Sequence, residues 1–194
     1  MSLEEDLRNI ARSQRVYASL RAGGTKCQIE LGVVTDLLGA METQGSRRYH
    51  NPRSLSQDPP DCDAQTLGGE PVAIEVTEFV SQVAVEMNEA ARPGPGQVPA
   101  MEQMVMAVWD QTSFISHLAS ALAGKDRKIL HGGPYSEYVV VSYTDEPLLV
   151  RAHAEAWLSA HAFGPYQQIT SAYFLFSYEG DHTYHFAELS LGGT

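Results

Sequence analysis

Apolar residues that recur at helical spacing divide the N-terminal part of the chain into two predicted helices. Residues 3–21 carry a broken apolar stripe, which ends at Gly23-Gly24. Thr25 is suited to cap a second helix that runs to about residue 42. Its buried face is expected to consist of Ile29, Val33, Val34, Leu37, Leu38 and Met41. Glu30 lies beside that face and is expected on the same helix.

A β-hairpin is predicted for residues 61–79, with arms at 61–67 and 71–79 around Gly68-Gly69. Its second arm alternates, so that one face carries Val72, Ile74 and Val76, and the other Ala73, Glu75 and Thr77. A two-residue turn would place Cys62 opposite Glu75, with Asp61 and Asp63 facing away. A three-residue turn would place Asp63 opposite Glu75, with all three carboxylates on one face. We expect the second register, because it groups Cys62 with the apolar residues.

The remaining pattern completes an α/β fold. Two breaker-rich stretches, at about 44–60 and 88–98, are predicted to be mobile loops. A long helix is expected from Pro99 to about residue 123, with Gly124 at its end. Residues 137–143 predict a buried strand, 147–161 a helix, and 170–178 with 182–190 an aromatic hairpin. Together they predict a single domain over residues 1–194, with a mixed central sheet flanked by helices and a C-terminal hairpin.

Composition narrows the class of protein. The chain has 194 residues, of which 43% are apolar and 19% charged, enough for one sizeable core. No apolar run approaches the roughly 18–20 residues that span a bilayer, and the acidic start does not resemble a signal peptide. The two cysteines, Cys27 and Cys62, are expected to be free thiols in a reducing compartment. The sequence therefore predicts a cytoplasmic protein without a membrane segment.

The net charge of −11 opposes nonspecific attraction to nucleic acid. A nucleic-acid partner would need a local basic surface, and two groups of residues offer one. Arg47, Arg48 and Arg53 fall in the first predicted loop, while Lys125 and Lys128 follow the long predicted helix. A solvated loop and an ordinary basic helix end are the alternative interpretations of these groups.

Carboxylates on the predicted hairpin offer the clearest chemistry. Cleavage of a phosphodiester with a metal ion needs hard oxygen ligands for Mg²⁺ or Mn²⁺, typically one or two carboxylates. The metal then polarises the phosphate and lowers the pKa of the attacking water. Asp61 and Glu75 would lie on adjacent strands about 4.8 Å apart, which suits a shared cation. A solvated acidic sheet face is the competing interpretation.

The motif Pro60-Asp61-Cys62, a short hairpin and then Ile74-Glu75-Val76-Thr77-Glu78 resembles the PD-(D/E)xK nuclease superfamily, in a branch with the pattern NPPD and IEVTE. The resemblance implies a restriction-endonuclease-like core and a metal held by Asp61 and Glu75, with the Val76 carbonyl as a further ligand. It also implies a supporting acidic role for Glu30 on the preceding helix. The element order agrees over roughly residues 25–145.

The chain departs from the superfamily at one position. Thr77 stands where the superfamily has a lysine, and a threonine cannot offer a positive charge to a developing anion. Some members carry this lysine on a following helix instead. By that analogy Lys125 or Lys128 would take the role, and we expect Lys125 to be catalytic with Asp61 and Glu75.

Three functions remain open at this level. The first is a Mg²⁺- or Mn²⁺-dependent nuclease that cuts DNA or RNA. The second is a catalytically inactive nuclease-like domain that binds a protein partner, as an immunity or antitoxin module does, which the acidic charge and the aromatic hairpin allow. The third is an interaction domain in which the motif is a coincidence.

Overall fold

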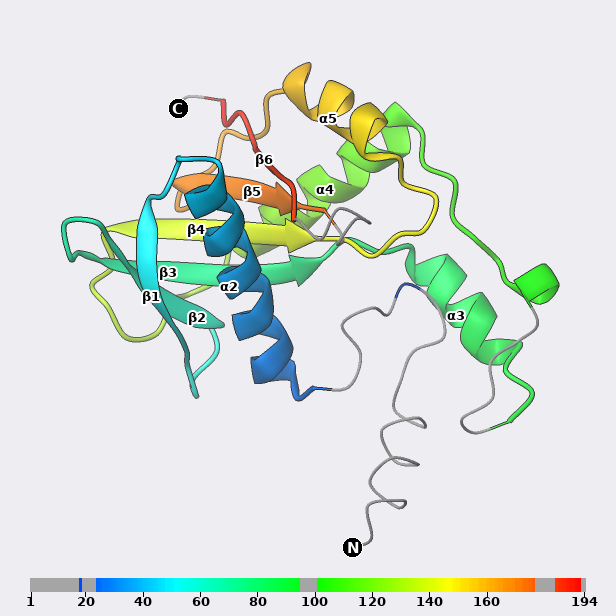
Figure 1. The fold of residues 1–194 in the computed structure, drawn as a ribbon, viewed down its shortest axis with the longest axis horizontal. Coiled ribbons are helices and arrows are strands. Elements are labelled where there is room, and N and C mark those ends of the chain that lie inside the picture. The colour runs from blue at the N-terminus through cyan, green and yellow to red at the C-terminus, as the bar shows by residue number, and fades with distance from the viewer. Residues whose placement is uncertain (1–17, 19–23, 95–100, 177–183, 193–194) are drawn as a thin grey trace, which may run out of the picture.

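The computed structural model describes residues 18, 24–94, 101–176 and 184–192. Figure 1 shows a central sheet whose strands are crossed by one helix in front and accompanied by others behind. The elements, in chain order, are α2 (Lys26–Thr43), β1 (Tyr49–Ser54), β2 (Cys62–Thr66), β3 (Pro71–Glu78), α3 (Gln82–Ala90), η1 (Met101–Gln103), α4 (Gln111–Asp126), β4 (Glu137–Tyr143), α5 (Arg151–Ser159), β5 (Ser171–Leu175) and β6 (Phe186–Glu188).

The sheet has six strands in the order β1-β2-β3-β4-β5-β6. The pairs β3–β4 and β4–β5 are parallel, and the other three pairs are antiparallel. The predicted mixed sheet flanked by helices is thereby confirmed, whereas the restriction-endonuclease-like core stays a prediction. The predicted C-terminal hairpin corresponds to the antiparallel pair β5–β6, and its turn lies outside the described residues.

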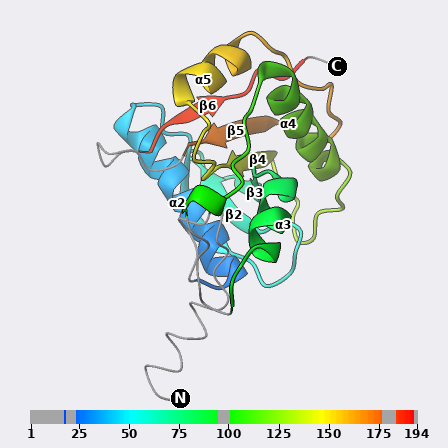
Figure 2. The same cartoon turned by 90° about the vertical axis from the view of Figure 1, so that its right-hand side faces the viewer.

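Each face of the sheet has its own apolar core. Alternation along β4 sends Val139 and Val141 into the core under α2, and Tyr138 and Val140 into the core under α4 and α5. Figure 2 shows α2 and α4 on opposite sides of the strands. The aromatic ring of Phe174, from the predicted aromatic hairpin, is buried in the second core.

α2 forms as the sequence predicts. The Thr25 hydroxyl accepts a hydrogen bond from the Gln28 amide, and the Gln28 side chain bonds the Thr25 amide in return, a capping box that satisfies two helix-end donors. The buried residues of the helix are Glu30, Val33, Val34, Leu37, Ala40 and Met41. Glu30 is thus a carboxylate on the face that packs against the sheet, which matters for the site. The helix predicted for residues 3–21 lies outside the described residues, apart from Ala18.

The prediction of a loop over residues 44–60 was wrong, because β1 occupies Tyr49–Ser54. Only Tyr49 of this strand is buried, so β1 lacks the apolar alternation that would have revealed it. Its backbone hydrogen bonds with β2 stabilise it instead. The second predicted loop, about 88–98, overlaps the end of α3, which begins after the capping residue Ser81.

The predicted helix over 99–123 was also wrong in its bounds. α4 begins only at Gln111, because the Asp110 carboxylate accepts from the Ser113 amide at 2.7 Å and caps the helix there. It continues through Gly124 to Asp126. Residues 104–110 run in irregular backbone, and Pro99 lies outside the described residues. The strand predicted at 137–143 is confirmed as β4, and the helix predicted at 147–161 is the shorter α5.

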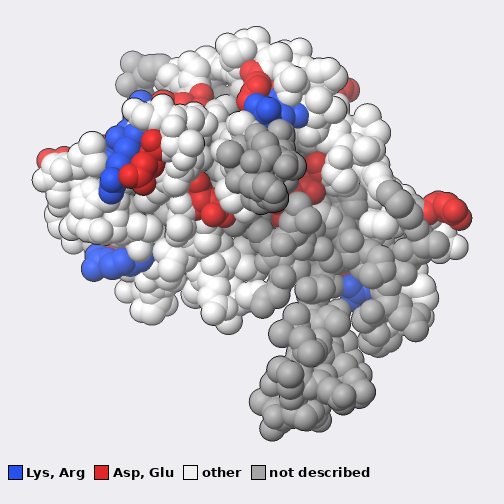
Figure 3. Space-filling model, viewed as in Figure 1, with Lys and Arg blue, Asp and Glu red and all other residues white. Residues whose placement is uncertain are grey.

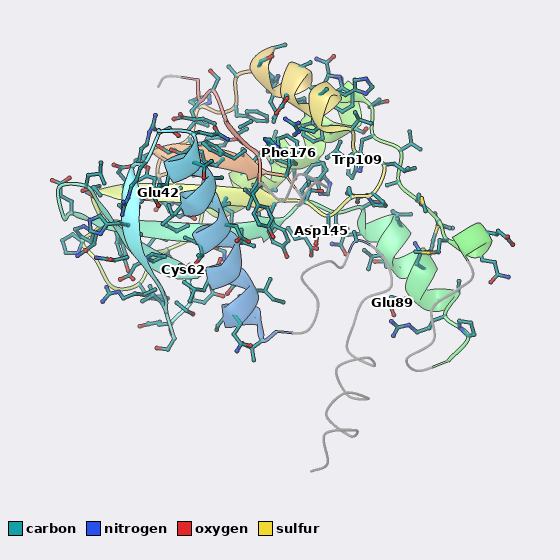
Figure 4. All side chains as sticks on the ribbon, in the orientation of Figure 1. Glu42, Cys62, Glu89, Trp109, Asp145 and Phe176 are labelled. Carbon is teal, nitrogen blue, oxygen red and sulfur yellow. The ribbon has the colours of Figure 1, made fainter. Side chains whose placement is uncertain are left out.

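The hairpin pairs Cys62 with Ile74 and Asp63 with Ala73. This register keeps the predicted division of faces, with Cys62 in the α2-side core (Figure 4). It is shifted by two residues from the predicted register, in which Asp63 opposes Glu75. The turn contains Leu67, because the Thr66 amide donates to the Glu70 carbonyl. Extending the observed pairing by one residue brings Asp61 level with Glu75.

The end of α4 is tied to the segment that leads into β5. The Asp126 carboxylate accepts from the backbone amides of Gln167, Gln168 and Ile169 at 3.0, 2.8 and 3.1 Å. Burial opposes the charged form of Asp126, but these three donors outweigh it and hold its pKa below the ordinary value. These hydrogen bonds hold the backbone at the end of α4 against the segment before β5. In the part of the chain that the structure describes, no helix is long and apolar enough to cross a membrane.

We expect Asp126→Ala to lower the free energy of unfolding by about 1–3 kcal/mol at pH 7, because three amides lose a charged acceptor. A lowered pKa means that this contribution is present above the ordinary carboxyl pKa of 3.8 and is lost as pH falls through the native value. Urea denaturation at pH 7 and pH 3 measures both. Glu155→Ala, which removes only the exposed Arg151 pair on α5, is the control and should change stability by less than about 0.5 kcal/mol.

Candidate functional site

The candidate site forms where β2 stops short of its neighbour β3. β2 begins only at Cys62, which pairs with Ile74, so the Val76 amide of β3 has no partner on β2. The Asp61 carboxylate replaces that partner: its Oδ2 accepts from the Val76 N–H at 2.8 Å. Both Asp61 and Glu75 are buried, at 4% and 0% exposure. The two carboxylates of the motif are thus brought to one open edge of the sheet.

Two lysines from the end of α4 surround Glu75. Lys125 Nζ donates to Glu75 Oε2 at 2.6 Å and to the Val76 carbonyl at 2.8 Å, and lies 3.9 Å from Asp61 Oδ2. Lys128 Nζ donates to Glu75 Oε1 at 2.9 Å. Each oxygen of this fully buried carboxylate therefore has its own ammonium, which offsets the cost of burying its charge.

A third lysine approaches from α2. Lys26 Nζ lies 2.6 Å from Asp58 Oδ2, 3.4 Å from Glu30 Oε1 and 3.5 Å from Asp61 Oδ1. Lys128 also reaches Asp58, at 3.6 Å. We call the whole set the lysine–carboxylate cluster: Lys26, Glu30, Asp58, Asp61, Glu75, Lys125 and Lys128. With four carboxylates and three ammoniums, its formal charge is −1 when every group is ionised.

The carboxylates of the cluster differ in proton affinity. Burial, together with the nearby Asp61 charge, raises the pKa of Glu30 from 4.5 to about 7. Burial also raises the pKa of Glu75, helped by Asp61 and opposed by the two lysines. For Asp61, burial is outweighed by its contact with the Glu75 carboxyl group, by the hydrogen bond from the Val76 amide and by the Lys125 charge, so its pKa is lowered. Asp61 is the most firmly ionised of the three, and Glu30 can take up a proton near neutral pH.

The donor set fits a hard cation. One oxygen each from Asp58, Asp61 and Glu75 lies within 4.8 Å of the others, among the residues that the structure describes. The Val76 carbonyl adds a further oxygen, since Lys125 already uses it together with Glu75. Mg²⁺ and Mn²⁺ favour carboxylate and carbonyl oxygens of this kind. Asp61 and Glu75 therefore lie together with Asp58 as a third carboxylate, and their role as metal ligands stays a prediction.

Sequence reasoning missed Asp58 and Lys26. Asp58 and Asp61 flank the dipeptide Pro59-Pro60. The Asp61 carboxylate lies near Lys26, and the Asp58 carboxylate lies near Lys128. Lys26 stands four residues before Glu30 on α2, and this spacing was the available signal for an ion pair. Glu30 itself lies beside Asp61 but outside the three-carboxylate group, so its predicted place as a metal ligand remains a prediction.

The predicted basic surface is divided. Lys125 and Lys128 belong to the cluster, whereas the arginines form ion pairs elsewhere: Arg47 with Glu42 at 3.2 Å, Arg48 with Glu188 at 2.8 Å and Arg53 with Asp63 at 2.6 Å. On the face drawn in Figure 3, the described basic side chains form separate groups, not a continuous band. Lys125 and Lys128 thus lie among carboxylates, and the cluster carries no excess of positive charge without a bound cation.

Glu30 gives the metal-free site a measurable pH dependence. Between pH 4.5 and about 7 the folded state holds a proton that the unfolded chain has released, so stability falls as pH rises through this window. We expect Glu30→Gln to remove that loss, and the difference from the wild type to reach up to about 3 kcal/mol by pH 8. Urea denaturation in a chelator at pH 4.5 and pH 8 measures it. Glu42→Gln, an exposed change on the same helix, is the control; a constant difference for Glu30→Gln across this range would contradict the raised pKa.

Comparisons with known proteins do not extend the resemblance. No family model, no curated protein and no solved structure matches the chain.

Proposed function

We propose that this protein is a phosphodiesterase of the nuclease type that uses Mg²⁺ or Mn²⁺ held by Asp61 and Glu75. The observation that carries the proposal is the position of the Lys125 ammonium. It donates hydrogen bonds to the Glu75 carboxylate and the Val76 carbonyl, and it lies near Asp61. A positive charge therefore already occupies the centre of a set of hard oxygen donors. A position that stabilises one cation by these oxygens suits another cation that prefers the same ligands.

A divalent ion bound there would polarise a phosphate oxygen and lower the pKa of an attacking water. It would also change the formal charge of the cluster from −1 to +1, which favours an anionic phosphodiester. Asp58, Asp61 and Glu75 could each give one oxygen to the ion, because these oxygens lie within 4.8 Å of one another. Nucleic acid, DNA or RNA, is the phosphodiester substrate that we propose.

The chain's own groups supply the remaining roles. Lys128, whose side chain is 34% exposed, is placed to contact a phosphate from solvent while it remains paired with Glu75. Lys125 would stabilise the charge that develops on the phosphate, in place of the lysine that Thr77 replaces. Glu30, whose pKa is about 7, is suited to accept a proton at its carboxylate near neutral pH.

The alternative, an inactive nuclease-like domain that binds a protein partner, differs in one measurable respect. Such a domain can keep the lysine–carboxylate cluster as a permanent internal ion-pair network, with Lys125 fixed between Glu75 and Val76. It would not cleave a phosphodiester, whether or not a divalent metal binds at this place. The proposed function depends on metal binding, and the first test measures that directly.

We expect Mn²⁺ to bind the wild-type protein and to raise its melting temperature, since a ligand at about 100 times its Kd adds about 2.7 kcal/mol of stability. Asp61→Asn should lose this binding by isothermal calorimetry. Asp63→Asn is the matched control, because Asp63 follows on the next strand position of the same face but pairs with Arg53 outside the cluster. The proposal fails if millimolar Mn²⁺ neither binds nor shifts the wild-type melt.

Lys125→Ala should abolish metal-dependent cleavage of an oligonucleotide and bind Mn²⁺ at least as tightly as the wild type. The ammonium is needed for the reaction, yet it occupies oxygens that the metal uses. Because Lys128 remains on Glu75, we expect the variant to fold, with a stability loss of a few kcal/mol at most, about the cost of breaking a buried pair. Arg127→Ala, an exposed neighbour on the same helix end, is the control. Wild-type cleavage by Lys125→Ala would contradict the assigned role.

A further inference from the structure

A cavity of about 470 Å³ adjoins the lysine–carboxylate cluster on the α2 side of the sheet. Its apolar wall is formed by Ile29 from α2, Val76 from β3 and the Tyr143 ring from β4. Its polar lining includes Lys26, Glu30 and Glu78. This volume falls in the range of small-molecule binding sites, and the mixture of an apolar wall with a few polar groups is typical of them.

Val76 joins the cavity to the cluster within one residue. Its amide and carbonyl bond Asp61 and Lys125 at the edge of β3, while its side chain belongs to the α2-side core and lines the cavity. Lys26 and Glu30 likewise belong to both places. A ligand whose anionic group lies at the cluster can therefore extend its next chemical group directly into the cavity.

The lining selects a particular kind of group. A planar ring can pack on the Tyr143 ring and between the aliphatic side chains of Ile29 and Val76, as bases do on aromatic residues in single-strand binding proteins. The carboxylates of Glu30 and Glu78 are hydrogen-bond acceptors when ionised, and exocyclic amino groups of bases are the complementary donors.

We propose that this cavity is a nucleobase subsite, which takes an amino-bearing base of the nucleotide whose phosphate lies at the lysine–carboxylate cluster. The inference rests on the proposed function and assigns its substrate class: nucleic acid with an unpaired base at the cleavage position. A base inside a duplex is held by stacking and pairing and reaches such a pocket only after it is flipped out, at a cost of a few kcal/mol.

The charge distribution supports the same substrate class. Tracking a duplex requires many basic contacts to phosphates, and the net charge of −11 opposes such binding. The arginines on and beside β1 are engaged with Glu42, Asp63 and Glu188. Nucleic acid would instead be bound through one nucleotide, which occupies the cluster and its adjoining cavity.

The test compares adenosine 5′-monophosphate with ribose 5-phosphate, which lacks the base, by calorimetry in the presence of Mn²⁺. Stacking on an aromatic side chain contributes about 1–3 kcal/mol per base, so we expect the wild type to bind the nucleotide about 5-fold to 150-fold more tightly than ribose 5-phosphate. Ile29→Trp should fill the cavity and bring this ratio close to one without changing Mn²⁺ affinity. Leu38→Trp, a half-buried position farther along α2, is the matched control and should keep the ratio.

Tyr143→Leu provides a second variant that removes the ring while it keeps an apolar side chain in the core, and it should also lower the ratio. Cleavage of a single-stranded oligonucleotide should be faster than cleavage of the same strand in a duplex. Equal affinity of the wild type for adenosine 5′-monophosphate and ribose 5-phosphate overturns the subsite, as does equal cleavage of the single strand and the duplex. If Mn²⁺ still binds in that case, the proposed function stands without the subsite. Absence of Mn²⁺ binding overturns the proposed function itself.

Discussion

The hydrogen bond between the Val76 amide and the Asp61 carboxylate is the interaction on which the site depends. β2 begins only at Cys62, so the Val76 amide of β3 has no partner on β2. A buried N–H without an acceptor costs about 1–3 kcal/mol, and Asp61 avoids that cost with its own side chain. The same break leaves the Val76 carbonyl to Lys125. The late start of β2 thus leaves the Val76 amide to hold the Asp61 carboxylate and the Val76 carbonyl to accept from a cation.

Because Glu75 is buried, the helix packed beside it must supply positive charge. A fully buried carboxylate is costly without opposite charge, and α4 places Lys125 and Lys128 on its two oxygens. The helix end that carries them is held from two sides. The Tyr138 hydroxyl of β4 donates to the Lys125 carbonyl at 3.1 Å, and the Asp126 carboxylate binds the backbone before β5. The ammoniums are therefore positioned by the sheet as well as by their helix.

The sequence predicted which residues share a face better than which residues are neighbours. Alternation along β3 and the grouping of Cys62 with the apolar residues are local patterns, so the common face of Asp61 and Glu75 could be predicted, whereas their register depends on whether Leu67 belongs to the turn. The position of Lys125 beside Glu75 was expected from the motif, because Thr77 carries no charge and another element would have to supply one. Asp58 was not, because its position depends on lysines from two separate helices. The polar strand β1 was missed for a related reason, since pairing with β2 stabilises it and apolar patterning does not.

The lysine that we propose for the reaction stands on α4 and not on β3, and this placement bears on what the site can do. A lysine on β3 would be fixed beside the glutamate by the strand, but Lys125 extends from a helix end and competes for the oxygens that a metal needs. Because Glu75 has a second ammonium in Lys128, withdrawal of Lys125 leaves this carboxylate paired. Exchange of the Lys125 ammonium for a divalent ion therefore does not require a buried charge to become unpaired at any stage. Under the proposed function, the lysine that leaves Glu75 is then free to face the phosphate, so the same side chain stabilises the metal-free fold and serves the metal-bound site.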